Sequence, residues 1–306
     1  MHRVFFLAYI LFCSYYWLMN LNESESTFPV EAPITNIEQS SAYPKIKDIV
    51  RLFLVFLLYN VIFGIVLAFF LVLFKTFNVK SPLLDSFLGM VLYTIIMLAT
   101  INYAIKRSKS KDLFTFHIRF SHVPVWIIPV VIISTLALFV FLNRVSALIP
   151  MPTSVQKFFG TMFTKDIFSV ILLVAFAPIL EEILFRGIVL EGLLKNYKPH
   201  YAILISAILF AVTHMNPWQA IPAFFGGLFI GWVYYKTQSI IPGMIIHATI
   251  NGIAATLLFF PKYQMDLLTV LGVHYYILLF GLSILVFSIS CVIIQKRIST
   301  VSEITD

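Results

Sequence analysis

Two adjacent glutamates in an apolar stretch of the chain are the first residues whose spacing suits acid–base chemistry. Glu181 and Glu182 are followed by Arg186, four residues after the second glutamate. Neighbouring side chains on a helix point about 100° apart, so the two carboxylates cannot share one role. Glu182 and Arg186 can pair on one helix face. Glu181 is then left unpaired, and an unpaired carboxylate in an apolar cavity suits a general base near neutral pH.

Two further apolar stretches each carry a histidine one helical turn from a second distinctive side chain. Phe210 and His214 share one helix face, and so do His247 and Asn251. The imidazole of His247 and the amide of Asn251 can both donate hydrogen bonds toward one point, which is what stabilising an oxyanion requires. Structural roles also fit these residues: interhelical hydrogen bonds for the two later motifs, and a salt bridge at a helix end for the first.

The ordered motifs Glu-Glu-x-x-x-Arg, Phe-x-x-x-His and His-x-x-x-Asn, each in its own apolar stretch, resemble those of the CPBP family. This family comprises the CAAX prenyl proteases and the bacteriocin-processing or self-immunity proteins, and it is also called the Abi family. The similarity covers residues 167–260, and the chain keeps the family pattern at every motif position. The resemblance implies an intramembrane endopeptidase.

The resemblance also implies a role for each motif residue. In the family, the first glutamate and the histidine of the second motif activate a water molecule; here these are Glu181 and His214. The second histidine and the asparagine hold the oxyanion; here these are His247 and Asn251. The other motif residues would support these four without acting on the substrate: Glu182, Arg186 and Phe210.

A metal is the main alternative within this chemistry. Glu181, His214 and His247 could in principle form a Glu-His-His zinc set. The sequence contains no His-Glu-x-x-His segment, which is the usual signature of a zinc protease. The family has been described both as metalloproteases and as glutamate proteases that need no metal. We expect a mechanism without a cofactor, with zinc as the alternative.

The elements that must position these residues are expected to lie in a membrane. Of the 306 residues, 60% are hydrophobic and only 11% are charged, whereas a soluble domain usually carries about 25% charged residues. The net charge of +7 comes from basic residues in short loops between apolar runs. Basic residues in such loops set the orientation of membrane helices, so we expect no nucleic-acid partner. Cys13 and Cys291 lie inside apolar runs and provide neither a disulfide framework nor a cysteine metal site.

Runs of about 20 mostly apolar residues predict an all-α, polytopic transmembrane bundle of about eight or nine spanning helices. An N-terminal run over residues 4–19 is either a retained ninth helix, which we favour, or a signal peptide, and the polar residues 20–43 read as a linker. The eight remaining spans are expected at residues 52–74, 86–105, 123–143, 167–194, 201–215, 221–235, 240–260 and 273–295.

The spans divide the chain into four predicted regions. These are an N-terminal helix plus linker (1–50), N-terminal transmembrane helices (51–160), a CPBP-like catalytic core (161–262), and a C-terminal helix with a cytoplasmic tail (263–306). The loop richest in basic residues is expected to be cytoplasmic. It contains Lys106, Arg107, Lys109, Lys111 and Arg119.

The predicted function is hydrolysis of a peptide bond in a membrane-associated peptide or protein. The substrate is expected to be a prenylated CAAX-type tail or a peptide precursor, and the location a bacterial cell membrane. One alternative is a non-catalytic bacteriocin self-immunity or membrane binding protein that uses the same cavity. A transporter with Glu181 and the histidines as a proton relay is another, but inverted repeats, which would favour it, are not visible in the sequence.

Overall fold

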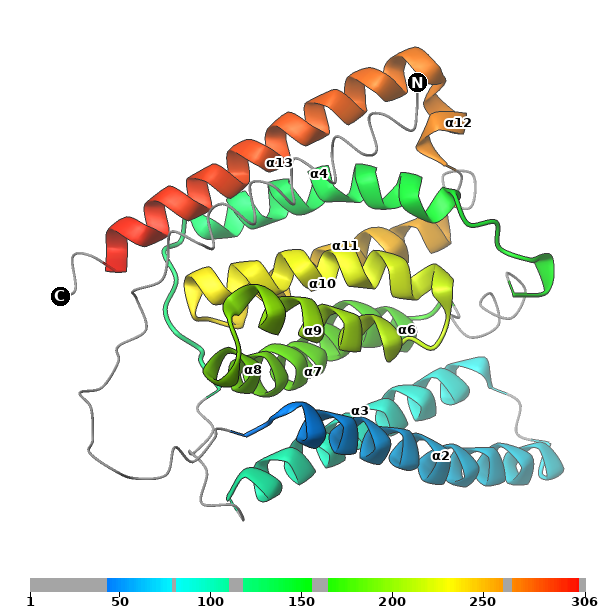
Figure 1. Ribbon diagram of the computed structural model, residues 1–306. Helices are drawn as coiled ribbons and strands as arrows, with labels where there is room; N and C mark the ends of the chain where they lie inside the picture. Colours follow the sequence, from blue (N-terminus) through cyan, green and yellow to red (C-terminus); the bar gives the residue numbers. More distant parts are fainter. Residues whose placement is uncertain (1–42, 79–80, 110–117, 156–164, 261–265, 303–306) are drawn as a thin grey trace, which may run out of the picture.

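The computed structural model describes residues 43–302 except 79–80, 110–117, 156–164 and 261–265 (Figure 1). The predicted N-terminal helix at 4–19 and most of the linker that follows lie outside the described residues. Within the described part the regular structure is helical, and the one β-bridge pairs Phe120 with Ser239. The all-α prediction is therefore confirmed.

The eight apolar runs expected from residue 52 onward all form helices. The elements are α2 (Ile46–Thr76), α3 (Pro82–Lys109), α4 (Ile127–Ala147), α6 (Ile167–Ile171), η1 (Leu172–Phe176), α7 (Ala177–Glu182), η2 (Ile183–Leu190), α8 (Glu191–Asn196), α9 (Pro199–Val212), α10 (Pro217–Thr237), α11 (Ile241–Phe259), α12 (Leu267–Leu271) and α13 (Val273–Ser302). The five elements from α6 to α8 follow one another without a break and form one rod, in which η1 and η2 are π-helical.

Six of the helices in the described ranges are long and apolar enough to cross a membrane, fewer than the eight expected. The rod from Ile167 to Asn196 is among them, and α9, with 14 residues, is shorter. Helix α10 has 21 residues but is less apolar, and its stretch 226–235 is almost wholly buried. A helix enclosed by other helices needs little lipid-facing surface. The chain is a multi-pass integral membrane protein.

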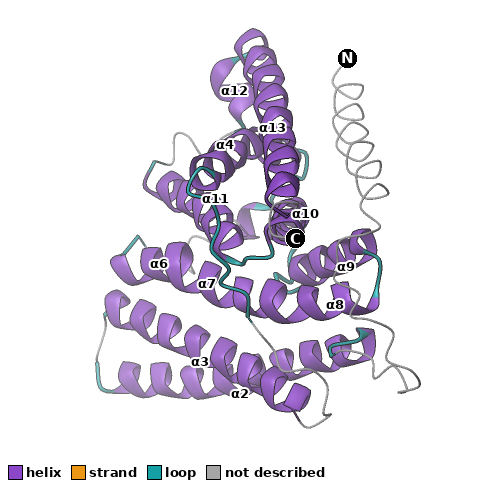
Figure 2. Cartoon of the chain, turned by 90° about the vertical axis from the view of Figure 1, so that its left-hand side faces the viewer, coloured by secondary structure: helices purple, strands orange, loops and turns teal. Residues whose placement is uncertain are grey.

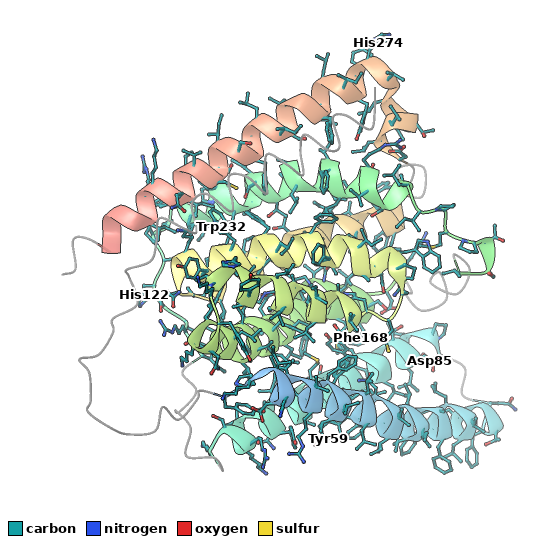
Figure 3. All side chains as sticks on the ribbon, viewed as in Figure 1. Tyr59, Asp85, His122, Phe168, Trp232 and His274 are labelled. Carbon is teal, nitrogen blue, oxygen red and sulfur yellow. The ribbon has the colours of Figure 1, made fainter. Side chains whose placement is uncertain are left out.

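The helices pack in layers around the rod (Figures 1 and 2). Helices α2 and α3 form a hairpin on one side, and α3 contacts α6 and α7 of the rod. On the other side α11 contacts η1 and α7, α10 lies between α9 and α11, and α13 packs on α4. Apolar side chains of α2 and α13 project away from the bundle (Figure 3), as expected for surfaces that face lipid.

Glycines in α10 let it approach α9 closely, as small residues do between membrane helices. A Cβ added to Gly231 would lie 3.0 Å from the Ile203 side chain, and one added to Gly227 would lie 3.3 Å from Phe210. The close contact brings the end of α9, with its histidine motif, against the centre of the bundle.

Candidate functional site

The two adjacent glutamates of α7 lie in different surroundings, as their angular separation on a helix requires. The side chain of Glu181 is 17% exposed, whereas that of Glu182 is fully buried. Glu181 lines a cavity of about 310 Å³, and Glu182 does not. The expectation that the two carboxylates serve different purposes is consistent with this arrangement.

Glu182 connects two neighbouring side chains through one oxygen. Its Oε1 lies 3.0 Å from Nη1 of Arg186 and 2.9 Å from Nδ1 of His247. The expected ion pair with Arg186 is therefore present, and the guanidinium also donates to the carbonyl of Gly227 at 3.2 Å. Because a carboxylate only accepts, Nδ1 of His247 carries the proton. The ring is thus held with its other nitrogen, Nε2, 3.8 Å from Oε2 of Glu181.

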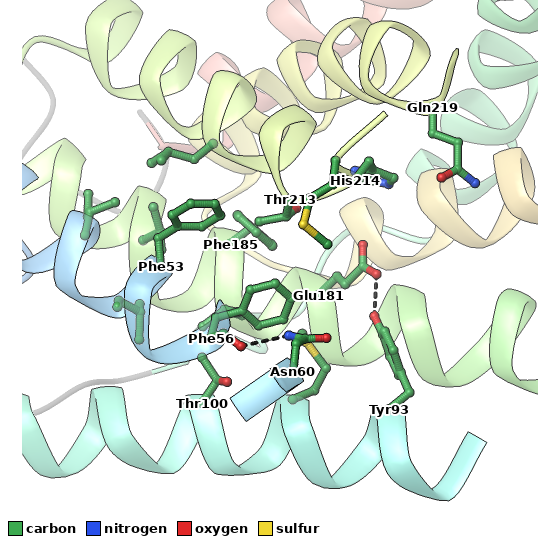
Figure 4. A pocket seen from close by; sticks show the side chains of 17 residues that line it. Phe53, Phe56, Asn60, Tyr93, Thr100, Glu181, Phe185, Thr213, His214 and Gln219 are labelled. Carbon is green, nitrogen blue, oxygen red and sulfur yellow. Dashed lines mark hydrogen bonds between the residues drawn. The ribbon is translucent and has the colours of Figure 1, made fainter. Parts of the chain in front are cut away.

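The other oxygen of Glu181 has a partner that the sequence reasoning missed. The hydroxyl of Tyr93, in α3, donates a hydrogen bond to Oε1 of Glu181 (Figure 4). A tyrosine in an apolar span is ordinarily an aromatic packing residue, so its type and position alone carried no signal. Glu181 is therefore held between a phenol on one oxygen and the imidazole of His247 near the other.

The second motif supplies His214 at the end of α9. Its Nδ1 lies 2.9 Å from the carbonyl oxygen of Phe210, which directs Nε2 away from the helix. The ring of Phe210 contacts both imidazoles edge-on, with centroid distances of 5.1 Å to His214 and 5.5 Å to His247. Phe210 also lies under the guanidinium of Arg186, at 4.8 Å. It therefore packs against both histidines and the buried ion pair.

The cavity has a polar end and an apolar wall (Figure 4). Glu181, His214, Tyr93 and Gln219 line its polar part. Its apolar wall includes residues from α2, α3 and η2, among them Ile49, Leu52, Phe53, Phe56, Met97, Leu184, Phe185 and Val189. Such a pocket can place an apolar chain beside a carboxylate and an imidazole.

Asn251 has a contact different from the one expected. Its amide Nδ2 donates to the carbonyl of Leu173, in η1, at 2.8 Å. In this π-helical turn the N–H of Ala177 donates to the carbonyl of Leu172, five residues before it. In the same register the N–H of residue 178 would donate to the carbonyl of Leu173. Residue 178 is a proline and has no N–H. Asn251 supplies the missing donor, and it does not line the cavity.

The alternative zinc set is not assembled as metal ligands. Within the described residues no group of three or more His, Cys, Asp and Glu side chains is arranged to hold a metal ion. Glu181 and His247 approach each other, with 3.8 Å between Oε2 and Nε2, but His214 does not complete a group of three with them. The donor set does not fit zinc in this arrangement, and no step below passes through a metal.

Comparison with known proteins places the three motifs in one family segment. Residues 163–253 match the family described as type II CAAX prenyl endopeptidase Rce1-like. Over 75 residues, 24% of the chain, the sequence is 37% identical to UPF0177 protein YxdF of Lactococcus lactis subsp. lactis (strain IL1403). The match spans 41% of that protein, less than half its length. No solved structure matches the chain. The segment 163–253, which holds all three motifs, is therefore similar to the Rce1-like family of type II CAAX prenyl endopeptidases, in agreement with the resemblance to the CPBP proteases.

Proposed function

We propose that this chain is an intramembrane endopeptidase that hydrolyses a peptide bond of a membrane-associated peptide with the help of Glu181. The observation that carries the proposal is the placement of Glu181. Its carboxylate shares a cavity with His214, and its Oε2 lies 3.8 Å from Nε2 of His247. Placing an ionisable side chain inside a membrane costs free energy, and a carboxylate grouped with two imidazoles there is typical of a functional site.

In the proposed reaction Glu181 takes up one proton of a water molecule in the cavity, while His214 accepts a hydrogen bond from the same water and orients it. The water oxygen attacks the carbonyl carbon of the scissile bond, and the carbonyl oxygen becomes an oxyanion. We place the oxyanion beside Nε2 of His247, which lies 3.8 Å from Oε2 of Glu181, and the ring, with both nitrogens protonated, donates to it. Collapse of the intermediate breaks the C–N bond, and the proton first taken from water passes to the leaving amine. The products are a new carboxylate and a new amine.

The substrate class follows from the cavity wall. The polar end around Glu181 is continuous with apolar side chains of α2 and η2, such as Phe53 and Val189. A peptide with an apolar residue or lipid chain next to the scissile bond fits this shape, because burial of apolar surface stabilises binding. We propose a prenylated CAAX-type tail or an apolar peptide precursor as the substrate.

The test is cleavage by the purified full-length protein in liposomes. The panel contains farnesylated CAAX peptides and membrane-inserted peptide precursors, and products are read by mass spectrometry with and without a chelator. We expect at least one peptide to be cut and Glu181→Gln to slow the cut by at least about a hundredfold, the usual contribution of a general base.

The matched control for that variant is Asp85→Asn. Asp85 lies in the first turn of α3 and is exposed, so its replacement removes a carboxylate without touching the cavity. Activity should be unchanged. A wild-type protein that binds peptides but cuts none of them would contradict the proposal and favour a non-catalytic binding protein. Cleavage that the chelator abolishes would contradict the metal-free mechanism.

A further inference from the structure

A hydroxyl from outside the family segment contacts the proposed catalytic carboxylate. Tyr93 lies in α3, 88 residues before Glu181, and its phenol donates to Oε1 of that glutamate. The matched family segment begins only at residue 163. The polar end of the cavity is therefore completed by a helix that none of the three motifs includes.

We propose that Tyr93 is a positioning residue for the reaction, which holds Glu181 so that Oε2 is presented to His247 and to the cavity. The inference rests on the proposed endopeptidase function. A glutamate side chain has three rotatable bonds, and fixing one oxygen leaves the other with a defined direction. A general base must lie within hydrogen-bond reach of the proton that it removes, so this orientation is a condition for efficient catalysis.

The contact is more than a means of attaching α3 to the rod. Other contacts between the same elements already make that attachment: Ser86 donates to Asp166 at 2.7 Å, and Phe87 packs edge-on against Phe168 at 5.1 Å. The hydroxyls of Thr94 and Thr100, also in α3, bond to carbonyls of their own helix. The phenol of Tyr93 instead reaches a carboxylate of another helix, inside the cavity.

The bond also provides a donor where few others are present. In an apolar cavity a carboxylate oxygen without a partner is costly. A phenol can supply this donor while remaining neutral, so it adds no second charge to the membrane interior.

Two measurements on Tyr93→Phe test the proposal. The first is infrared spectroscopy of the protein in lipid, in which the carboxyl band that disappears in Glu181→Gln identifies Glu181. That band should change frequency in Tyr93→Phe. The second is steady-state cleavage of whichever panel peptide is cut by the wild type. We expect kcat to fall roughly ten- to a hundredfold, the range for loss of a hydrogen bond to a charged group, with KM nearly unchanged.

Tyr103→Phe is the matched control. It removes the same atom from the same helix, but Tyr103 packs on the hydrophobic core and does not line the cavity. Both the band and kcat should keep their wild-type values in this variant, and circular dichroism should show that both variants are folded. If the Glu181 band is unchanged in Tyr93→Phe, the hydrogen bond between Tyr93 and Glu181 is not present. If kcat is unchanged, Tyr93 does not position Glu181 for the reaction. If the wild type cuts no peptide, the proposed endopeptidase function is wrong. The infrared band then shows by itself whether Tyr93 bonds to Glu181.

Discussion

At the scale of single residues, Glu182 is the centre of the buried polar network. Its Oε1 meets both Arg186 and His247, and its Oε2 is buried with no hydrogen-bond partner within the described residues. Arg186 is itself fully buried. A buried charge is tolerated only when an opposite charge compensates it. The two neighbouring glutamates are therefore expected to respond differently to the same substitution.

Glu182→Gln should destabilise the protein, whereas Glu181→Gln should not. Removing the charge of Glu182 leaves the guanidinium of Arg186 buried and uncompensated, at a cost of about 3–5 kcal/mol. Glu181 faces a cavity, and its amide analogue can still accept from Tyr93. The check is the thermal unfolding midpoint of both variants in the same detergent. Equal midpoints would contradict the roles assigned to the two carboxylates.

The sequence predicted the residue-scale features that depend on spacing within one helix. The Glu182–Arg186 pair followed from the four-residue spacing, and the separation of Glu181 followed from the helical angle. The partners contributed by other helices, Tyr93 to Glu181 and Glu182 to His247, did not follow from any spacing. Contacts between distant segments depend on the packing of the bundle, which a single sequence does not reveal.

At the scale of elements, the π-helical segment η1 depends on a partner from another helix. Pro178 removes the N–H that would serve the carbonyl of Leu173, and Asn251 of α11 supplies a donor instead. In hydrocarbon each backbone carbonyl needs a partner, so this bond fixes α11 against the rod. It also explains why Asn251 points to η1, although it shares a helix face with His247.

Asn251→Leu should destabilise the protein by about 1–2 kcal/mol, because the Leu173 carbonyl loses its donor. In a Pro178→Ala background the cost should be smaller, since alanine restores an N–H at the position that serves Leu173. The measurement is a double-mutant cycle on the unfolding free energy. The same cost in both backgrounds would show that the bond to Leu173 does not account for Asn251.

The helices were predictable from the sequence to within a few residues, but the π-helical register was not. The apolar run expected at 167–194 is the rod Ile167–Asn196, and that expected at 240–260 is α11. The segments η1 and η2 keep the hydrophobic composition of an ordinary helix, so periodicity does not distinguish them. The burial of α10 was not predicted either, because an apolar run of this length is expected both for a helix that faces lipid and for one enclosed by other helices.

At the scale of the whole molecule, the loop that is expected to be cytoplasmic meets two other segments at one end of the bundle. Arg119 forms an ion pair with Glu191 and donates to Gln238 at 2.8 Å, and Lys195 also pairs with Glu191. The loop before α4, the end of the rod and the turn after α10 are thus tied together. If the loop before α4 is cytoplasmic, the other two segments lie on the cytoplasmic side with it.

The orientation can be tested at the two ends of the rod, where Lys165 precedes α6 and Lys198 follows α8. About 30 residues of helix separate them, roughly 45 Å. In a background without Cys13 and Cys291, Lys198→Cys should be shielded from a membrane-impermeant maleimide in intact cells, and Lys165→Cys should react. Both should react after lysis. The reverse pattern in intact cells would invert the predicted topology.

The predicted regions 1–50, 51–160, 161–262 and 263–306 stay a prediction at this scale. The family match at 163–253 lies inside the third of them, but α3 contributes Tyr93 to the same cavity, and α2 contributes its apolar wall. The candidate site therefore needs helices from outside the region that the motifs defined. Sequence motifs identify the residues that carry charge, whereas the apolar wall that shapes the substrate has no comparable signature.

The central claim, that Glu181 directs a water molecule at a peptide bond, is tested most directly by one single-turnover cleavage. Excess protein in liposomes is mixed with a panel peptide in ¹⁸O-labelled water, and the new carboxyl terminus is analysed by mass spectrometry. The account predicts one ¹⁸O atom in that terminus with the wild type, and a rate at least about a hundredfold lower with Glu181→Gln. A product without ¹⁸O, or equal rates from the two proteins, would contradict it.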